Sequence, residues 1–183
     1  MNKSPDDFDS PWKMAFHNFL PEFVALFFPK MYRAIDWSRG VEFLDKEFLR
    51  IARDAKLGRS HADVLVKVWL KNGQEVRILI HIEVQSQRDA KLPERMYVYN
   101  YRAYDKYRLV IWSLAVLADE SKSWRPKKFE NRAFDCVAGL HYPIIKLSDF
   151  RAPKQRRRLE RSTNPFALLV PRASGNAGHE RRV

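Results

Sequence analysis

The chain has 183 residues, of which 45% are hydrophobic and 31% are charged, with a formal net charge of +12 at pH 7. This composition is typical of a globular protein and excludes a chain that is disordered throughout. The single cysteine excludes an internal disulfide and suits the reducing cytoplasm. No apolar run approaches the roughly 20 residues that span a bilayer, so we expect no membrane partner.

The positive charge is distributed unevenly. Residues 151–183 hold nine Lys or Arg against two Glu, a net charge of +7, whereas the rest of the chain carries +5. A basic surface attracts phosphate backbones because binding releases counterions. A solvated tail is the alternative explanation, so the charge supports a nucleic acid partner without establishing one.

The first part of the chain is expected to be helical. Ser10-Pro11 is typical of a helix start, and the apolar residues over 12–20 follow helical spacing. Pro21 should bend or restart this helix. We expect its dense aromatic residues to form core rather than a surface that stacks on bases.

Residues 35–53 have a mixed pattern, and both a strand and a helix remain open there. Asp45 and Glu47 are reserve acidic ligands or, alternatively, members of surface ion pairs. Residues 54–60 are polar and predict a loop.

Residues 61–87 predict a β-hairpin around which the rest of the fold is arranged. β-Branched residues alternate with other side chains on both sides of Asn72-Gly73, a strong turn signal. A three-residue loop over 72–74 places Asp63 opposite Glu83 and matches the two apolar faces. Loops of two or four residues mix these faces, so burial favours the three-residue loop.

In this register Asp63, His81, Glu83 and Gln85 gather at one end of the hairpin. Two carboxylates beside a buried sheet repel each other unless a cation lies between them. Hard oxygen ligands favour Mg²⁺ or Mn²⁺, which can activate a water and polarise a phosphodiester. The alternative is an ordinary one-sided hairpin with a solvated polar face. His81 is expected to have a role other than metal ligand.

A helix is predicted over residues 93–107, with Arg95 in its first turn. Arg95 could reach a phosphate, or it could form a structural ion pair. The apolar run over 108–117 predicts a strand that is buried on both faces. If this strand is parallel to the hairpin strand, the helix makes a right-handed crossover.

The remaining segments have weaker patterns. Residues 119–128 predict a polar loop, and residues 132–140 and 142–147 are strand candidates. Residues 148–161 form a charged segment with helical potential. Residues 171–183 lack apolar periodicity, so we expect a disordered basic tail.

Six short motifs along residues 8–170 occur in an order that resembles a known family. They are Asp9-Ser10-Pro11-Trp12-Lys13, EFLDKE at 42–47, IHIEVQ at 80–85, ERM at 94–96, YNY at 99–101 and NPFA at 164–167. They resemble the bacterial Rpn family of recombination-promoting, transposase-like nucleases, within the PD-(D/E)xK nuclease superfamily. The Asp…Glu-x-Gln core is a variant that occurs in this family.

The resemblance implies a restriction-endonuclease-like α/β core, with a mixed sheet flanked by helices, over residues 1–170. The family continues the helix that starts near Asn164, whereas here the chain meets Pro171, so we expect a C-terminally shortened member.

The resemblance also implies roles for particular residues. Asp63 and Glu83 would hold Mg²⁺ or Mn²⁺ with the Val84 carbonyl as a third ligand, and Gln85 would position a water or a phosphate oxygen. Lys13 or a second metal would compensate for the lysine that Gln85 replaces, whereas from composition alone Lys13 is an ordinary solvated lysine. Asp9 and Arg95 would support the site.

The expected function is therefore a cytoplasmic, Mg²⁺-dependent DNA endonuclease linked to recombination or mobile elements. A homo-oligomer is compatible with this expectation. The alternatives are a nuclease-like module that binds DNA without cutting it and a protein-interaction component.

Overall fold

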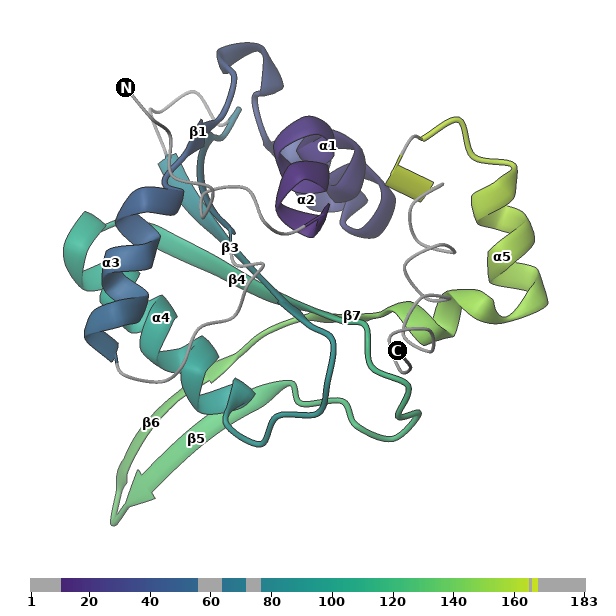
Figure 1. The fold of residues 1–183 in the computed structure, drawn as a ribbon. Helices are drawn as coiled ribbons and strands as arrows, with labels where there is room; N and C mark the ends of the chain where they lie inside the picture. Colours follow the sequence, from purple (N-terminus) through teal and green to yellow (C-terminus); the bar gives the residue numbers. More distant parts are fainter. Residues whose placement is uncertain (1–10, 56–63, 72–76, 165, 168–183) are drawn as a thin grey trace, which may run out of the picture.

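The computed structural model describes residues 11–55, 64–71, 77–164 and 166–167. Five strands form a mixed sheet in the order β1-β2-β3-β4-β7, and two further strands form a separate ribbon, β5-β6 (Figure 1). The strands are β1 (Glu42–Phe43), β2 (Val64–Trp69), β3 (Arg77–Gln85), β4 (Val110–Leu117), β5 (Lys128–Ala133), β6 (Cys136–His141) and β7 (Ile144–Lys146). The helices are α1 (Pro11–Phe27), α2 (Pro29–Ala34), η2 (Trp37–Arg39), α3 (Asp45–Ala55), α4 (Leu92–Tyr107), η3 (Leu147–Arg151) and α5 (Pro153–Glu160). The coarse prediction of a mixed sheet flanked by helices is confirmed.

The predicted hairpin register is confirmed over the described strands. β2 and β3 are antiparallel, and their pairs run from Val64 opposite Ile82 to Trp69 opposite Arg77. This is the register of the three-residue loop, which keeps the valine face of β2 beside the isoleucine face of β3. The loop and Asp63 lie outside the described residues.

α4 connects β3 to β4, and these two strands are parallel. The predicted helix and the following strand are therefore confirmed. The expectation that the whole strand is buried was wrong, because only its second half, from Ser113 onward, is buried. Val110 is 67% exposed because it lies at the start of β4, outside the part of the strand that pairs with β7. It comes two residues after Arg108, whose left-handed backbone conformation ends α4.

Each face of the sheet is covered by helices. The largest core cluster joins α1 to the inward residues of β2, β3 and β4, and it includes Phe16, Phe23, Val66 and Ile80. On the other face, α3 and α4 pack over smaller clusters built around Leu65, Leu79 and Tyr99. Phe16 and Phe23 also pack against Phe166, which confirms that the aromatic N-terminal residues form core.

Some expectations from the sequence were incomplete or wrong. The break near Pro21 is confirmed, because Phe19 has a non-helical φ of −136° within α1. The open segment over 35–53 divides into η2, β1 and α3.

The single strand expected over 132–140 was wrong, because the chain reverses at Phe134 and Asp135. Phe134 has a φ of +52°, an uncommon conformation for a bulky residue, so its side chain type carried no turn signal. The segment therefore forms the end of β5, the turn and most of β6.

None of the helices in the described part of the chain is both long and apolar enough to cross a membrane.

Candidate active site

Glu83 lies near the end of β3 on the face that α4 covers. Strand alternation places it on the same face as Leu79, His81 and Gln85, and its side chain is fully buried. The residue opposite it on β4 is Ala115, which is small. A carboxylate buried in a sheet requires an electrostatic partner, because the desolvation of a lone charge is costly.

The main partner of Glu83 is Arg95, from the first turn of α4. Arg95 Nε donates to Glu83 Oε1 at 2.7 Å, and Nη2 donates to the same oxygen. Nη2 also donates to Gln85 Oε1 at 2.8 Å, and Nη1 donates to Asp89 Oδ2 at 2.6 Å. Arg95 therefore forms the ion pair that the sequence left as one alternative, and it holds three acceptors together.

The ion pair leaves part of Glu83 unsatisfied. Burial raises the pKa of Glu83 to about 7, although the Arg95 guanidinium acts in the opposite direction. Glu83 Oε2 is buried and has no hydrogen-bond partner among the described residues. A buried oxygen without a donor is costly, so this atom is a suitable ligand for a cation.

Tyr142 is a second polar group at this site that sequence patterns missed. It lies between β6 and β7 and is 4% exposed, and its hydroxyl has no partner among the described residues. Burial raises the pKa of Tyr142, and the negative charge of Glu83 raises it further. In the sequence Tyr142 stood only beside a strand break at Pro143, which gave no sign that it approaches Glu83.

His81 is buried in the core on the same face of β3 as Glu83. Its Nδ1 is hydrogen-bonded to Ser113 Oγ at 3.2 Å, and its ring packs against Phe48 and Tyr99. Burial, and then the charge of Arg95, lower the pKa of His81 to about 3, so the imidazole is neutral at physiological pH. Its Nε2 is buried without a hydrogen-bond partner among the described residues, so the expectation that His81 has a role other than metal ligand stays a prediction.

Lys13 lies in a different polar cluster, at the edge of the sheet. Lys13 Nζ is 3.6 Å from Asp45 Oδ2, which is also hydrogen-bonded to His17 Nε2 at 2.7 Å. The His17 ring stacks on Phe43 of β1. Asp45 therefore forms an ion pair, which is one of the two roles that the sequence left open for it. The structure does not place Lys13 in contact with Glu83 or Gln85.

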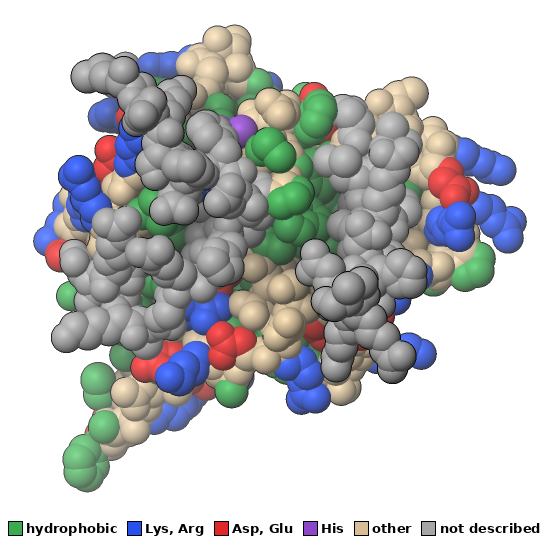
Figure 2. Space-filling view, viewed as in Figure 1, with side chains coloured by type: hydrophobic (Ala, Val, Ile, Leu, Met, Phe, Trp, Pro, Cys, Tyr) green, Lys and Arg blue, Asp and Glu red, His purple; other side chains and the backbone are tan. Residues whose placement is uncertain are grey.

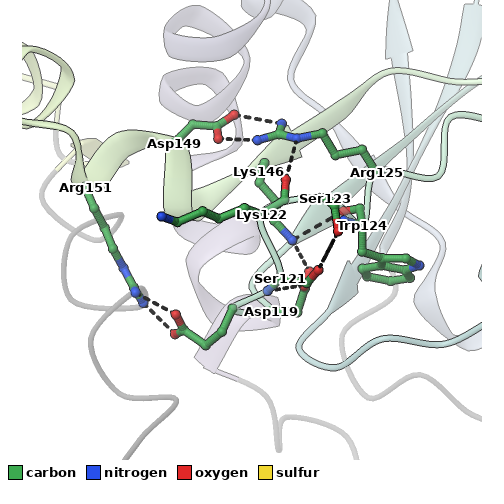
Figure 3. Close-up of polar contacts among 10 residues, drawn as sticks. Asp119, Ser121, Lys122, Ser123, Trp124, Arg125, Lys146, Asp149 and Arg151 are labelled. Atoms are coloured by element: carbon green, nitrogen blue, oxygen red, sulfur yellow. Dashed lines mark hydrogen bonds and ion pairs between the residues drawn. The ribbon is translucent and has the colours of Figure 1, made fainter.

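A buried ion pair lies at the end of the two neighbouring parallel strands (Figure 3). Lys146 Nζ donates to Asp119 Oδ2, and both side chains are almost completely buried. Gln85 pairs with Leu117 across β3 and β4, and Leu117 pairs with Lys146 across β4 and β7. Lys146 therefore lies in the same row of the sheet as Gln85, two strands away, with β4 between them.

Two ion pairs at the surface extend this network. Arg125 donates two hydrogen bonds to Asp149, and Arg151 donates two to Glu120 (Figure 3). Both connect the loop that follows β4 to η3. The loop after β4 is consequently fixed at the carboxyl end of the sheet.

The remaining predicted site residues are only partly placed. Val84 follows Glu83 on β3, with its side chain buried in the core on the opposite face. Asp9 and Asp63 lie outside the described residues, so the place of Asp63 opposite Glu83 stays a prediction. Within the described ranges no three His, Cys, Asp or Glu side chains are grouped as a metal site.

The comparisons with known proteins found no matching family model, no matching curated protein and no matching solved structure. The resemblance to the Rpn family therefore stays a prediction.

Proposed function

We propose that this protein is a metal-dependent DNA endonuclease whose metal site is built on Glu83. The observation that carries the proposal is a buried carboxylate at the end of β3 with one oxygen lacking a donor among the described residues. A raised pKa and a specific charged partner are common features of functional carboxylates. The cytoplasmic location and the link to recombination or mobile elements belong to the same proposal.

The residues on β3 suit an oxygen-liganded cation. Asp63 and Glu83 would hold Mg²⁺ or Mn²⁺ with the Val84 carbonyl, which is the chemistry that these hard cations prefer. When bound, the metal would act as a Lewis acid on the phosphodiester and lower the pKa of a water. The side-chain oxygen of Gln85 accepts a hydrogen bond from Arg95. The side-chain nitrogen of Gln85 therefore stays available as a donor for a phosphate oxygen.

Arg95 and Lys146 are two cations among the described residues near the carboxyl ends of the parallel strands. Arg95 contacts both Glu83 and Gln85, and Lys146 lies in the same row as Gln85. Lys13 pairs with Asp45 instead. We therefore assign to Arg95 the charge compensation that the sequence had assigned to Lys13.

One observation favours a second candidate, a nuclease-like module that binds DNA without cutting it. The Arg95 guanidinium already neutralises Glu83, as a metal would. If this ion pair persists when metal is present, Glu83 cannot act as a ligand through Oε1.

Cleavage of supercoiled plasmid separates the two candidates. Purified protein would be incubated with Mg²⁺, Mn²⁺, Ca²⁺ or EDTA, together with the variants Glu83→Gln and Asp63→Asn. The matched control is Asp105→Asn, which removes a carboxylate from an exposed ion pair with Arg108 at the end of α4. We expect nicking with Mg²⁺ or Mn²⁺ that is lost in both site variants and kept in the control. DNA binding without cleavage under every metal would favour the module.

A further inference from the structure

We propose that α5 binds the phosphate backbone of duplex DNA through a cationic stripe formed by Lys154, Arg157 and Arg161. The choice of DNA as the partner rests on the proposed function. The binding surface itself rests on the geometry of α5, which is independent of the Glu83 site.

The three side chains share one face of the helix. Their spacings of three and four residues place them in a single row, because an α-helix has about 3.6 residues per turn. Leu159 is 2% exposed and belongs to the main core, and it lies on the opposite side of the helix from this row. The packing of Leu159 therefore turns the cationic stripe toward solvent, and all three of its residues are exposed.

The stripe lines a hollow that suits an anion. Together with Pro153, its residues border a hollow of about 710 Å³, and no acidic residue is among its described lining. Two neighbouring cations are neutralised, since Arg156 pairs with Glu160 and Arg151 with Glu120. No such ion pair involves the three stripe residues within the ranges that the structure describes. Figure 2 shows Lys and Arg side chains gathered over α5 at the right edge of the molecule.

The stripe has dimensions that fit a polyanion better than a single phosphate. Lys154 and Arg161 are seven residues apart, which corresponds to about 10 Å along the helix axis. This length is comparable with the axial rise of about three nucleotides in one strand of B-DNA. Contacts to consecutive phosphates carry no sequence information, so we expect binding that is independent of sequence.

The structure ties α5 to the carboxyl ends of the parallel strands, on the face of the sheet opposite Glu83. α5 follows η3 after a single residue, and η3 is tied to the loop after β4 by Arg125–Asp149 and Arg151–Glu120 (Figure 3). That loop begins at the carboxyl end of β4, which is parallel to β3 and pairs with it as far as Gln85. α5 packs through Leu159 into the core on the face that α1 covers, whereas Glu83 lies on the face that α4 covers, so the stripe is a binding surface separate from the candidate active site.

The test compares two triple variants that lose the same charge. The stripe variant is Lys154→Gln, Arg157→Gln and Arg161→Gln. The control is Lys30→Gln, Arg33→Gln and Lys106→Gln, which removes three exposed cations from α2 and α4. Binding of the full chain to two unrelated fluorescent duplexes would be measured by anisotropy in EDTA over a range of salt concentrations. EDTA prevents cleavage, so binding is measured separately from catalysis.

We expect the stripe variant to bind both duplexes at least tenfold more weakly, with the slope of log Kd against log salt reduced by about three. The control should keep the wild-type slope. Equal losses in both variants, wild-type binding by the stripe variant, or no DNA binding by wild type would each overturn the inference. So would stripe-dependent binding to anionic lipid vesicles with no binding to DNA.

The plasmid assay keeps the two proposals distinct. Stripe-dependent binding by a protein that never cuts DNA would support the stripe and contradict the endonuclease. Cleavage by a protein whose DNA binding does not depend on the stripe would support the endonuclease and contradict the stripe.

Discussion

Glu83 is the residue on which the account depends most, because the fold buries a carboxyl group that water would stabilise in its charged form. Its pKa is raised from 4.5 to about 7, so the folded state holds the proton more tightly than the unfolded state does. Below about pH 4.5 the Glu83 carboxyl is protonated in both states, so its burial costs no free energy of ionisation. As the pH rises through about 7 the buried carboxyl is forced to ionise, and above that pH the folded state carries the full cost.

This sign gives a prediction for stability. Relative to Glu83→Gln, the wild-type protein should lose free energy of unfolding between pH 4.5 and 7, on the order of 3 kcal/mol in total. Urea unfolding of both proteins across this range would measure the difference. Two stability curves that stay parallel over the whole range would mean that Glu83 titrates normally.

Arg95 should set the pH at which Glu83 becomes a ligand. The guanidinium favours the charged carboxylate, so Arg95→Gln should raise the pKa of Glu83 further. The midpoint of metal-dependent cleavage should then move to higher pH, whereas Arg95→Lys should move it less. A pH profile of cleavage for the three proteins tests this, and a midpoint that is unchanged or lower in Arg95→Gln would count against it.

Among the elements, α1 depends on a distant aromatic ring for its place on the sheet. The ring centroid of Phe166 lies 5.0 Å from that of Phe23 and 5.8 Å from that of Phe16, and all three side chains are buried. This contact joins the first helix of the chain to its last described residues. It therefore closes the core on the face opposite α4.

Phe166→Ala should lower the free energy of unfolding by about 3–5 kcal/mol, because it removes a buried ring and leaves a cavity. Phe134→Ala is the matched control, since Phe134 is fully exposed at the turn between β5 and β6 and its loss should change stability by less than about 0.5 kcal/mol. Thermal and urea unfolding would compare them. Similar stabilities for the two variants would show that the aromatic cluster contributes little.

The elements that sequence predicted well are those specified by local patterns. The hairpin register followed from alternation and a turn signal, and α4 and β4 followed from helical spacing and an apolar run. The β5–β6 turn was missed because Phe134 lacks the side chain features of a turn residue. Local pattern was sufficient wherever one face of an element is buried by its immediate neighbours.

The partners of the candidate site could not be predicted in the same way. Arg95, in the first turn of α4, contacts Glu83. The sequence alone could not decide whether Arg95 forms this ion pair or reaches a phosphate. Tyr142 and Lys146 approach the site only because β7 lies beside β4, and no local pattern specifies that strand order. Lys13 was assigned to the site by resemblance and lies with Asp45 instead.

At the scale of the whole molecule, the candidate active site lies on the face of the sheet that α4 covers, whereas the proposed binding surface belongs to α5, which packs on the face that α1 covers. The carboxyl end of β3 presents Glu83 and Gln85, and ion pairs join the loop after β4 to η3, which precedes α5. Ligand sites in open α/β sheets commonly lie outside the carboxyl ends of strands.

The most direct measurement of the central claim is calorimetric titration of Mn²⁺ into the wild-type protein and Glu83→Gln at pH 8, where the Glu83 carboxyl is mostly ionised. Asp105→Asn serves as the control for loss of a carboxylate from an exposed ion pair with Arg108 at the end of α4. The account predicts saturable Mn²⁺ binding by the wild type and the control that is lost in Glu83→Gln. Binding of equal affinity in all three proteins, or in none, would contradict a metal site on Glu83.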